Sequence, residues 1–272
     1  MIKVHIITQN EPFYIPKMIK YLIENQNKSY KICSYTILNP SRKNKSLKHW
    51  FYERALLYSY VELIIVGFAF LFSKTISFLR IHTNYDSKML FSKANISQIK
   101  TKNVNNKFYI KKVKENNPDI ILSISCPQLF KHELISVPKI CCINAHGTLL
   151  PRHRGVFGSF WTLFYDDKEA GGTIHKMELR LDDGEIIWQK SFPVLQSDTQ
   201  FSIAYKTKKL MAYGLEESFE AINKGQKTIQ PNVHYLTSYH RSPTLEQAKD
   251  FKRKGKSIVR LSDLRLMLSK FY

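Results

Sequence analysis

Asn144 and His146 stand two positions apart at the end of a short apolar run that begins at Cys141. Residues two apart in a strand point to the same face, so both side chains would enter one cavity while Ala145 turns away. A neutral imidazole can take up a proton at cellular pH. An amide NH2 can donate a hydrogen bond to a developing oxyanion without carrying charge itself.

Asp182 is the third residue whose type suits this chemistry. It begins an Asp-Asp-Gly sequence between two strand-like segments, residues 172–177 and 185–194, which would place its carboxylate at a loop tip. That carboxylate could orient the imidazole, stabilise its cationic form and help to relay a proton through water. Each residue alone also has an ordinary structural role, a hydrogen-bonded histidine or a common turn. Together the three suit acyl transfer to an amine.

Glycines mark the same region as a site. Six of the ten glycines fall between residues 147 and 184, where the backbone must turn sharply or approach a ligand closely. Three histidines in the region, His146, His153 and His175, do not have the spacing of a zinc site, so we predict no metal. The turn at residues 9–12 has no glycine, which excludes the phosphate loops of nicotinamide oxidoreductases and NTPases.

The composition predicts a cytoplasmic protein of one main domain. The chain has 272 residues, of which 43% are hydrophobic, and its four cysteines form no Cys-x-x-Cys pair. Residues 2–8 read as a strand rather than as a secretory leader. The formal net charge of +20 comes from lysines spread over both ends of the chain, a pattern that favours a solvated basic surface over a nucleic-acid-binding face.

An apolar segment at residues 55–72 departs from this plain pattern. Glu62 is its only charged residue, and basic residues flank it on both sides. The run is marginal for a bilayer span, which needs about 20 such residues. A buried or half-buried helix is the favoured interpretation, and an interfacial helix that rests on the inner face of an anionic membrane remains open.

The order of predicted elements indicates an α/β fold. Strand-like runs at residues 2–8, 33–38, 118–124 and 139–144 alternate with helical patterns, as in a doubly wound, mostly parallel, Rossmann-like sheet. Aromatic residues at 157–164 have the helical spacing of a core stripe, and a long helix is expected at 202–222. We predict a catalytic domain at residues 1–195 and a short C-terminal helical extension at 196–272 that packs on it.

Three ordered motifs resemble those of the formyltransferases that use 10-formyltetrahydrofolate. They are the sequence from Asn144 to Gly155, the Gly-Thr-Ile-His run at 172–175, and the Leu-Asp-Asp-Gly-Glu-Ile run at 181–186. The resemblance implies a formyltransferase fold and a catalytic triad of Asn144, His146 and Asp182. It also implies that the folate contacts residues around this triad, which are Cys126, Gln128, Leu129, Gly147, Leu149 and Asp182.

The resemblance further implies a mechanism. The neutral amine of the acceptor would attack the formyl carbon, Asn144 would donate a hydrogen bond to the oxyanion, and His146, oriented by Asp182, would remove the amine proton. Methionyl-tRNA, glycinamide ribonucleotide and nucleotide-linked amino sugars are acceptors within the family, and some relatives only hydrolyse the folate.

The ends of the chain resemble formyltransferase-like proteins of bacterial surface-polysaccharide synthesis, at residues 7–16 and 239–246. We therefore expect an amino sugar, still attached to a nucleotide, as the acceptor. The methionyl-tRNA enzymes carry a C-terminal β-barrel domain, and little sequence follows Lys224 here. Three alternatives stay open: a methionyl-tRNA formyltransferase, a formyltetrahydrofolate hydrolase, and an inactive scaffold that binds folate or a membrane surface. The sequence leaves the sugar, the nucleotide and the oligomeric state undetermined.

Overall fold

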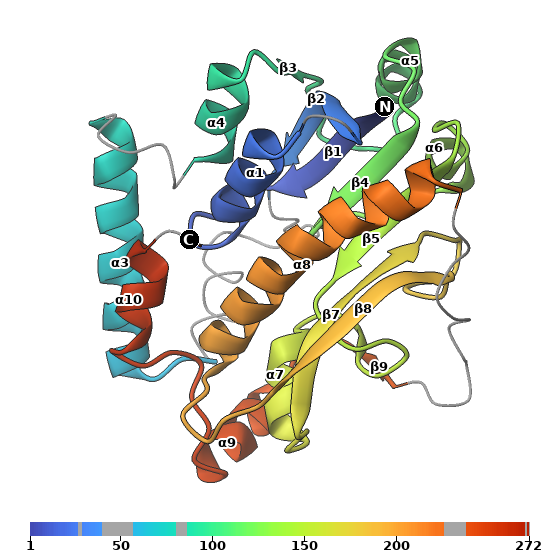
Figure 1. Ribbon diagram of the computed structural model, residues 1–272. Helices are drawn as coiled ribbons and strands as arrows, with labels where there is room; N and C mark the ends of the chain where they lie inside the picture. Colours follow the sequence, from blue (N-terminus) through green and yellow to red (C-terminus); the bar gives the residue numbers. More distant parts are fainter. Residues whose placement is uncertain (27–28, 40–56, 80–85, 226–237, 270, 272) are drawn as a thin grey trace.

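The computed structural model describes residues 1–26, 29–39, 57–79, 86–225, 238–269 and 271. One large sheet carries seven strands in the order β3-β2-β1-β4-β5-β7-β8 (Figure 1). The strands are β1 Ile2–Gln9, β2 Tyr30–Leu38, β3 Ser97–Gln98, β4 Ile120–Ile124, β5 Cys141–His146, β7 Glu169–Lys176 and β8 Ile186–Pro193. A second, two-stranded sheet pairs β6 Arg154–Gly155 with β9 Tyr239–His240.

The large sheet is parallel from β3 to β5 and antiparallel from β5 to β8. From β1 the chain winds outward to β2 and β3, and it then crosses back to continue through β4 and β5 on the other side. The carboxyl ends of β1 and β4 therefore flank the topological switch point, where open α/β sheets bind their ligands. The predicted doubly wound, mostly parallel fold is confirmed.

Helices cover both faces of the sheet. They are α1 Ile15–Glu24, α3 Tyr60–Phe78, α4 Ser87–Lys93, α5 Lys107–Glu115, α6 His132–Ile135, α7 Gly158–Phe164, α8 Gln200–Asn223, α9 Leu245–Arg253 and α10 Asp263–Leu268. In Figure 1, α1 and α8 lie across the front of the sheet, with α3 and α10 beside them. The side chains of α5 and α6 belong to a separate core cluster on the opposite face.

Strand β4 shows why the sheet is buried on both faces. All five of its residues are buried, and Ile120, Leu122 and Ile124 join the α1 and α8 core while Ile121 joins the α5 and α6 core. Such a continuous apolar strand is typical of a parallel sheet covered by helices on both sides. The prediction of a buried strand here is confirmed.

Helix α8 packs on the antiparallel strands of the sheet, β7 and β8. Thr199 caps its N-terminus in a reciprocal capping box with Ser202. The helix packs across β7 and β8, and Gly214 allows it to lie directly on the Trp188 ring, which a Cβ there would meet at 2.5 Å. After α8, β9 pairs with β6, which follows β5 in the chain. The predicted division of the chain at residue 195 stays a prediction.

The apolar segment forms α3, whose residues 60–78 are the one described helix long and apolar enough to cross a membrane. It lies at the edge of the molecule and buries one face only (Figure 1). Residues 55 and 56 of the predicted segment lie outside the described residues. Glu62, which seemed an interruption of an apolar run, is buried and caps the helix together with Ser59.

Candidate active site

The three residues that sequence patterns selected come together at the end of β5. Asn144 Nδ2 lies 3.4 Å from Asp182 Oδ1, and His146 Nδ1 lies 3.6 Å from Asp182 Oδ2. Asn144 and His146 share one face of β5, as their spacing predicts. Both contacts are long for hydrogen bonds. The three side chains therefore lie close together without forming short hydrogen bonds to one another.

Asp182 lies in the loop between β7 and β8, where the Asp-Asp-Gly sequence predicted it, and its side chain is buried. The loop between β7 and β8 folds back on the sheet, so that Asp182 is 6% exposed, with a positive φ of 51°. The Gly155 backbone N–H donates to its Oδ2 at 2.9 Å, and Arg154 pairs with the neighbouring Asp183. Strand β6 (Arg154–Gly155) thus anchors both carboxylates of the turn.

Asp182 stays ionised in this setting. Burial alone would raise its pKa, but the positive charge that His146 and His175 can take up and the Gly155 N–H favour the carboxylate and hold the pKa below its usual range. A permanent negative charge at this position stabilises an imidazolium next to it. The site can therefore accept a proton at His146 without creating an isolated buried charge.

His146 has its two ring nitrogens in different environments. Nε2 lies 3.2 Å from the carbonyl oxygen of His153, which requires that this nitrogen carry the proton in the neutral ring. The lone pair of Nδ1 then points toward Asp182. Burial lowers the pKa of His146, and Asp182 offsets part of that shift. The ring is a neutral base at pH 7, and the His153 carbonyl, rather than Asp182, fixes its tautomer.

His175 is a site residue to which the sequence assigned no role. It is buried on β7, where its Nδ1 donates to the Lys176 carbonyl at 2.7 Å. Its Nε2 lies 3.3 Å from Asn144 Nδ2 and 3.6 Å from Asp182 Oδ1. The signal was its place in the Gly-Thr-Ile-His run, since the antiparallel pairing of β5 with β7 sets His175 directly opposite Asn144.

Lys208 of α8 is a second residue that sequence patterns did not reveal. Its side chain is 8% exposed, and its Nζ donates to Ser125 Oγ at 2.9 Å, its one hydrogen-bond partner among the described residues. Burial lowers its pKa to about 8, with Glu11 acting in the opposite direction. Ser125 follows β4, so this buried ammonium lies at the carboxyl end of the strand next to β5.

The predicted folate loop follows β4. The Gln128 side chain is engaged, since its Oε1 accepts from the Val104 N–H and its Nε2 donates to the Lys102 carbonyl. Leu129 is largely exposed, and Cys126, whose pKa burial raises, donates its thiol to the Gln128 carbonyl. No hydrogen bond within the described part of the chain uses the backbone N–H of Gln128 or Leu129. These two amides are available to a ligand.

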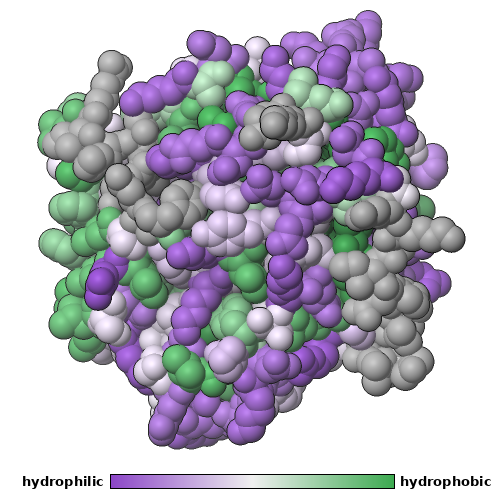
Figure 2. All heavy atoms as spheres, viewed as in Figure 1, coloured by the Kyte–Doolittle hydropathy of each residue, from purple (hydrophilic) through white to green (hydrophobic). Residues whose placement is uncertain are grey.

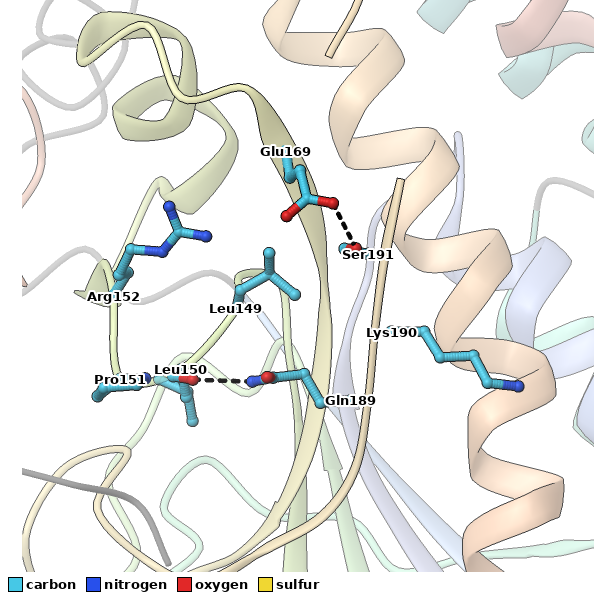
Figure 3. Close-up of a pocket in the computed structure, with 8 residues that line it drawn as sticks. All are labelled: Leu149, Leu150, Pro151, Arg152, Glu169, Gln189, Lys190 and Ser191. Atoms are coloured by element: carbon cyan, nitrogen blue, oxygen red, sulfur yellow. Dashed lines mark hydrogen bonds between the residues drawn. The ribbon is translucent and has the colours of Figure 1, made fainter. Parts of the chain in front are cut away.

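Gly147 and Leu149 belong to the loop that follows β5. Gly147 directly follows His146, and Thr207 of α8 packs beside it. Leu149 lies against Gly171 of β7 and lines a surface hollow of about 550 Å³ beside the outer strands (Figure 3). The hollow is lined by Leu149, Leu150, Pro151, Arg152, Glu169, Gln189, Lys190 and Ser191. Its lining contains none of the three clustered residues.

His240, from the C-terminal region, packs against the loop that follows His146. His240 Nε2 lies 3.1 Å from His153 Nδ1, and Asp167 Oδ2 lies 2.8 Å from His153 Nε2. The His240 ring also stacks on Trp161 at 4.4 Å. This packing fixes His153, whose carbonyl in turn orients His146.

These features define a doubly wound α/β protein with an acid–base cluster at the carboxyl ends of its strands. The sequence profile of the formyl transferase family matches residues 69–219, which is more than half of the chain. The match includes the whole cluster and most of α8. The chain belongs to the formyl transferase family, as the sequence motifs indicated.

Two named relatives illustrate the sequence similarity. The chain is 26% identical to the bifunctional polymyxin resistance protein ArnA of Wigglesworthia glossinidia brevipalpis over 76% of its own length and 34% of that protein. It is 30% identical to the methionyl-tRNA formyltransferase of Citrifermentans bemidjiense over 48% of its length and 41% of that protein. The chain thus spans between about a third and a half of the curated relatives that it matches.

Solved structures share the fold over nearly the whole chain. A sugar N-formyltransferase from a Shewanella species has a TM-score of 0.57 and 21% identity, covering 99% of this chain and 89% of its own. An N-formyltransferase from Helicobacter canadensis, in complex with folinic acid and dTDP-3-aminofucose, has a TM-score of 0.56 and 18% identity, covering 92% and 80%. At these identities the likeness shows the fold.

Proposed function

We propose that this protein transfers the formyl group of 10-formyltetrahydrofolate to the amine of an amino sugar linked to a nucleotide. The convergence of Asn144, His146 and Asp182 at one strand end, within the region that the family profile matches, carries the proposal. The three residues are catalytic in this account. The formyl donor supplies an activated carbonyl carbon, and the chain supplies the groups that handle charge and protons around it.

The amine of the acceptor attacks the formyl carbon, so that a new C–N bond forms and the carbonyl electrons move to oxygen. The Asn144 amide donates to that oxygen, because its present contacts, at 3.3 and 3.4 Å, are long enough to be exchanged for a stronger one. His146 takes the amine proton on Nδ1, and Asp182 stabilises the imidazolium. The same proton then goes to the nitrogen of tetrahydrofolate as its bond to the formyl carbon breaks.

Residues on the β4 side of the cluster fit a folate. The free backbone amides of Gln128 and Leu129 match the carbonyl and ring-nitrogen acceptors of a pterin. Their loop is held in place by Asn105, whose side chain contacts the Leu129 carbonyl and the Lys131 N–H. We assign Cys126, Gln128 and Leu129 to the donor site through their backbone. Gly147 fits this site by its position, whereas the Leu149 side chain faces the hollow of Figure 3.

The acceptor side is supported by Lys208 and by the structural neighbours. A buried ammonium with one neutral hydrogen-bond partner favours an anion, and the phosphates of a nucleotide-linked sugar supply one. The Helicobacter canadensis structure, whose fold this chain shares, is in complex with such a sugar. We place the phosphate of the acceptor at the switch point between β1 and β4.

A methionyl-tRNA acceptor is the second candidate. The methionyl-tRNA formyltransferases among the relatives, together with the net charge of +20, favour it. Both acceptors carry phosphate and present a primary amine to the same cluster. A hydrolase and a catalytically inactive binding protein use the same fold without an acceptor amine.

One assay separates these possibilities. Tetrahydrofolate release from 10-formyltetrahydrofolate is followed chromatographically with a panel of nucleotide-linked amino sugars, with methionyl-tRNA and without an acceptor. We expect release that depends on an amino sugar. Release with tRNA only would establish the second candidate, release without an acceptor would show a hydrolase, and folate binding without release would show an inactive binding protein.

A further inference from the structure

Helix α3 lies at the surface, but it turns small and polar residues toward the protein and apolar residues outward. The residues that face the protein are Glu62, Ile65, Ala69, Ser73 and Ser77, which recur at intervals of three or four and are mostly small or polar. On the outer face, Ile64 is 71% exposed, Phe68 56% and Leu71 67%. A surface helix of a soluble domain normally shows the opposite arrangement, with its apolar stripe toward the core.

Polar anchors hold α3 in this orientation. The Glu62 carboxylate accepts hydrogen bonds from the Ser59 N–H at 2.6 Å and from the Ile258 N–H at 2.7 Å. Ile65 and Ala69 pack into the main core, and α10 lies alongside (Figure 1). The helix cannot rotate its apolar face inward without breaking these contacts. The outer face is therefore a fixed feature of the fold.

The outer face is continuous and nearly free of charge. Its exposed apolar residues are Tyr60, Val61, Leu63, Ile64, Phe68, Phe70, Leu71, Phe72, Phe78 and Leu79. Figure 2 shows hydrophobic residues gathered along the edge where α3 lies in Figure 1. Exposed patches of this kind mark interaction sites. Lys74 is the one exposed charge on the helix, and its Nζ lies 5.6 Å from the Phe70 ring.

Charge favours an anionic membrane as the occupant of this face over a second copy of the chain. Two chains that each carry a net charge of +20 repel one another, whereas anionic lipid headgroups attract a protein of that charge. Lys74 on α3 and the exposed Arg265 on α10, packed beside it, provide cations next to the apolar residues. Cations beside an apolar face are typical of helices that lie in the membrane interface.

We propose that the outer face of α3 inserts into the surface of an anionic membrane, with the helix lying in the plane of the interface. The inward Glu62 and its backbone partners stay within the protein, so the helix does not span the bilayer. The proposal is independent of the formyl transfer reaction. It goes beyond that reaction by placing the protein at a lipid surface.

The test is cosedimentation of the full chain with vesicles of phosphatidylcholine containing phosphatidylglycerol, and with vesicles of phosphatidylcholine alone. The variant Ile64→Gln/Phe68→Gln/Leu71→Gln removes the apolar face. The matched control Phe108→Gln/Leu195→Gln/Leu245→Gln removes three exposed apolar side chains elsewhere on the surface. Circular dichroism and thermal unfolding establish that both variants are folded.

We expect the wild type and the control to bind the anionic vesicles at least about tenfold more strongly than the α3 variant. We expect Lys74→Gln to weaken binding roughly fivefold and added salt to act in the same direction. Equal binding by the α3 variant, or no binding by the wild type, would overturn the proposal. So would a wild-type dimer that the α3 variant converts to monomers, which would identify a second copy as the occupant. Retention in cell membranes after an alkaline carbonate wash would show that α3 spans the bilayer.

Discussion

Two histidines buried in strands of the same sheet have opposite surroundings. His5 of β1 is fully buried and faces three hydroxyl groups, with Ser34 Oγ at 2.7 Å, Tyr109 OH at 3.1 Å and Thr36 Oγ1 at 3.3 Å. His146 of β5 faces a carboxylate at 3.6 Å and a backbone carbonyl at 3.2 Å. One lies among neutral partners on both ring nitrogens, and the other lies beside a charge that it does not directly bond.

The presence or absence of a nearby carboxylate separates a cluster that only stabilises the fold from one that can exchange a proton. Hydroxyl groups can satisfy a neutral imidazole but offer nothing to a cation, so burial lowers the pKa of His5 to about 3. Asp182 instead offers His146 a counter-charge, while the long contacts leave room for a reacting group. A buried histidine indicates a site when its neighbours can stabilise both of its protonation states.

The largest effect should come from removing the charge that distinguishes the two clusters. Asp182→Asn keeps the shape of the side chain but cannot stabilise an imidazolium at His146. We expect acceptor-dependent turnover to fall by about a hundredfold to ten-thousandfold, with little change in melting temperature. Steady-state kinetics and thermal unfolding measure the two quantities. Turnover within tenfold of the wild type would remove Asp182 from the mechanism.

The complementary variant, His5→Leu, should affect stability instead of turnover. It leaves the hydroxyls of Ser34 and Tyr109 without the imidazole in a buried setting. We expect a loss of roughly 2–4 kcal/mol in the free energy of unfolding, measured in urea, with normal turnover of the folded protein. His146→Asn serves as the control with the opposite outcome. A His5 variant that is stable and inactive would invalidate the comparison.

The pH dependence of stability sharpens the same contrast. Because the pKa of His5 is about 3 in the folded protein and near 6.5 in the unfolded chain, the unfolded chain binds the extra proton between these values. Stability is therefore fully present above pH 6.5 and falls as the pH drops toward 3. We expect the slope of unfolding free energy against pH in this window to become shallower in His5→Leu. An unchanged slope would show that other groups control acid unfolding.

Lys208 should affect binding of the acceptor more than the chemical step. Lys208→Gln removes a buried cation that we place at the acceptor phosphate, so we expect the KM for the nucleotide-linked sugar to rise about tenfold or more. The KM for the formyl donor should change little. In the wild type the acceptor KM should rise above about pH 8, where the ammonium loses its proton. A matched rise in both KM values would point to a general distortion of the site.

The smallest effect should appear in the pH profile of turnover. Burial lowers the pKa of His146, Asp182 raises it, and the positive charge of Lys208 lowers it further. The neutral base is required, so kcat/KM should fall in acid, at a pH below the usual histidine range, as His146 takes a proton. In Lys208→Gln this acid limb should move to higher pH, because the charge that lowers the pKa of His146 is removed. A shift toward lower pH would contradict the proposed arrangement of charges.

Local sequence patterns predicted the strands of the large sheet other than β3, together with the strand-end pair. The apolar run of β4 and the two-residue spacing of Asn144 and His146 depend on periodicity alone, and both are present in the structure. The inward fold of Asp182 was not predictable, because it depends on the Gly155 N–H in another loop. Lys208 joins the site through a helix crossing, which leaves no local signature, whereas His175 lies in a motif that the sequence showed but needs the antiparallel pairing of β7 with β5 to reach Asn144.

The α3 segment shows the same limit. Its composition indicates an apolar helix, but which face it buries depends on Ile258 and Val259, nearly two hundred residues further along the chain. The catalytic roles of Asn144, His146 and Asp182 and the donor contacts of Cys126, Gln128 and Leu129 stay predictions from sequence. The structure gives these predictions distances and partners that experiments can test.

The most direct test of the central claim is to follow an isotope-labelled formyl group from 10-formyltetrahydrofolate into the acceptor. Wild type and Asp182→Asn are incubated with the donor and a nucleotide-linked amino sugar, and the product is analysed by mass spectrometry and NMR. We expect a labelled formamide on the sugar amine with the wild type and almost none with the variant. Labelled formate with an unmodified sugar, or equal labelling by both proteins, would contradict it.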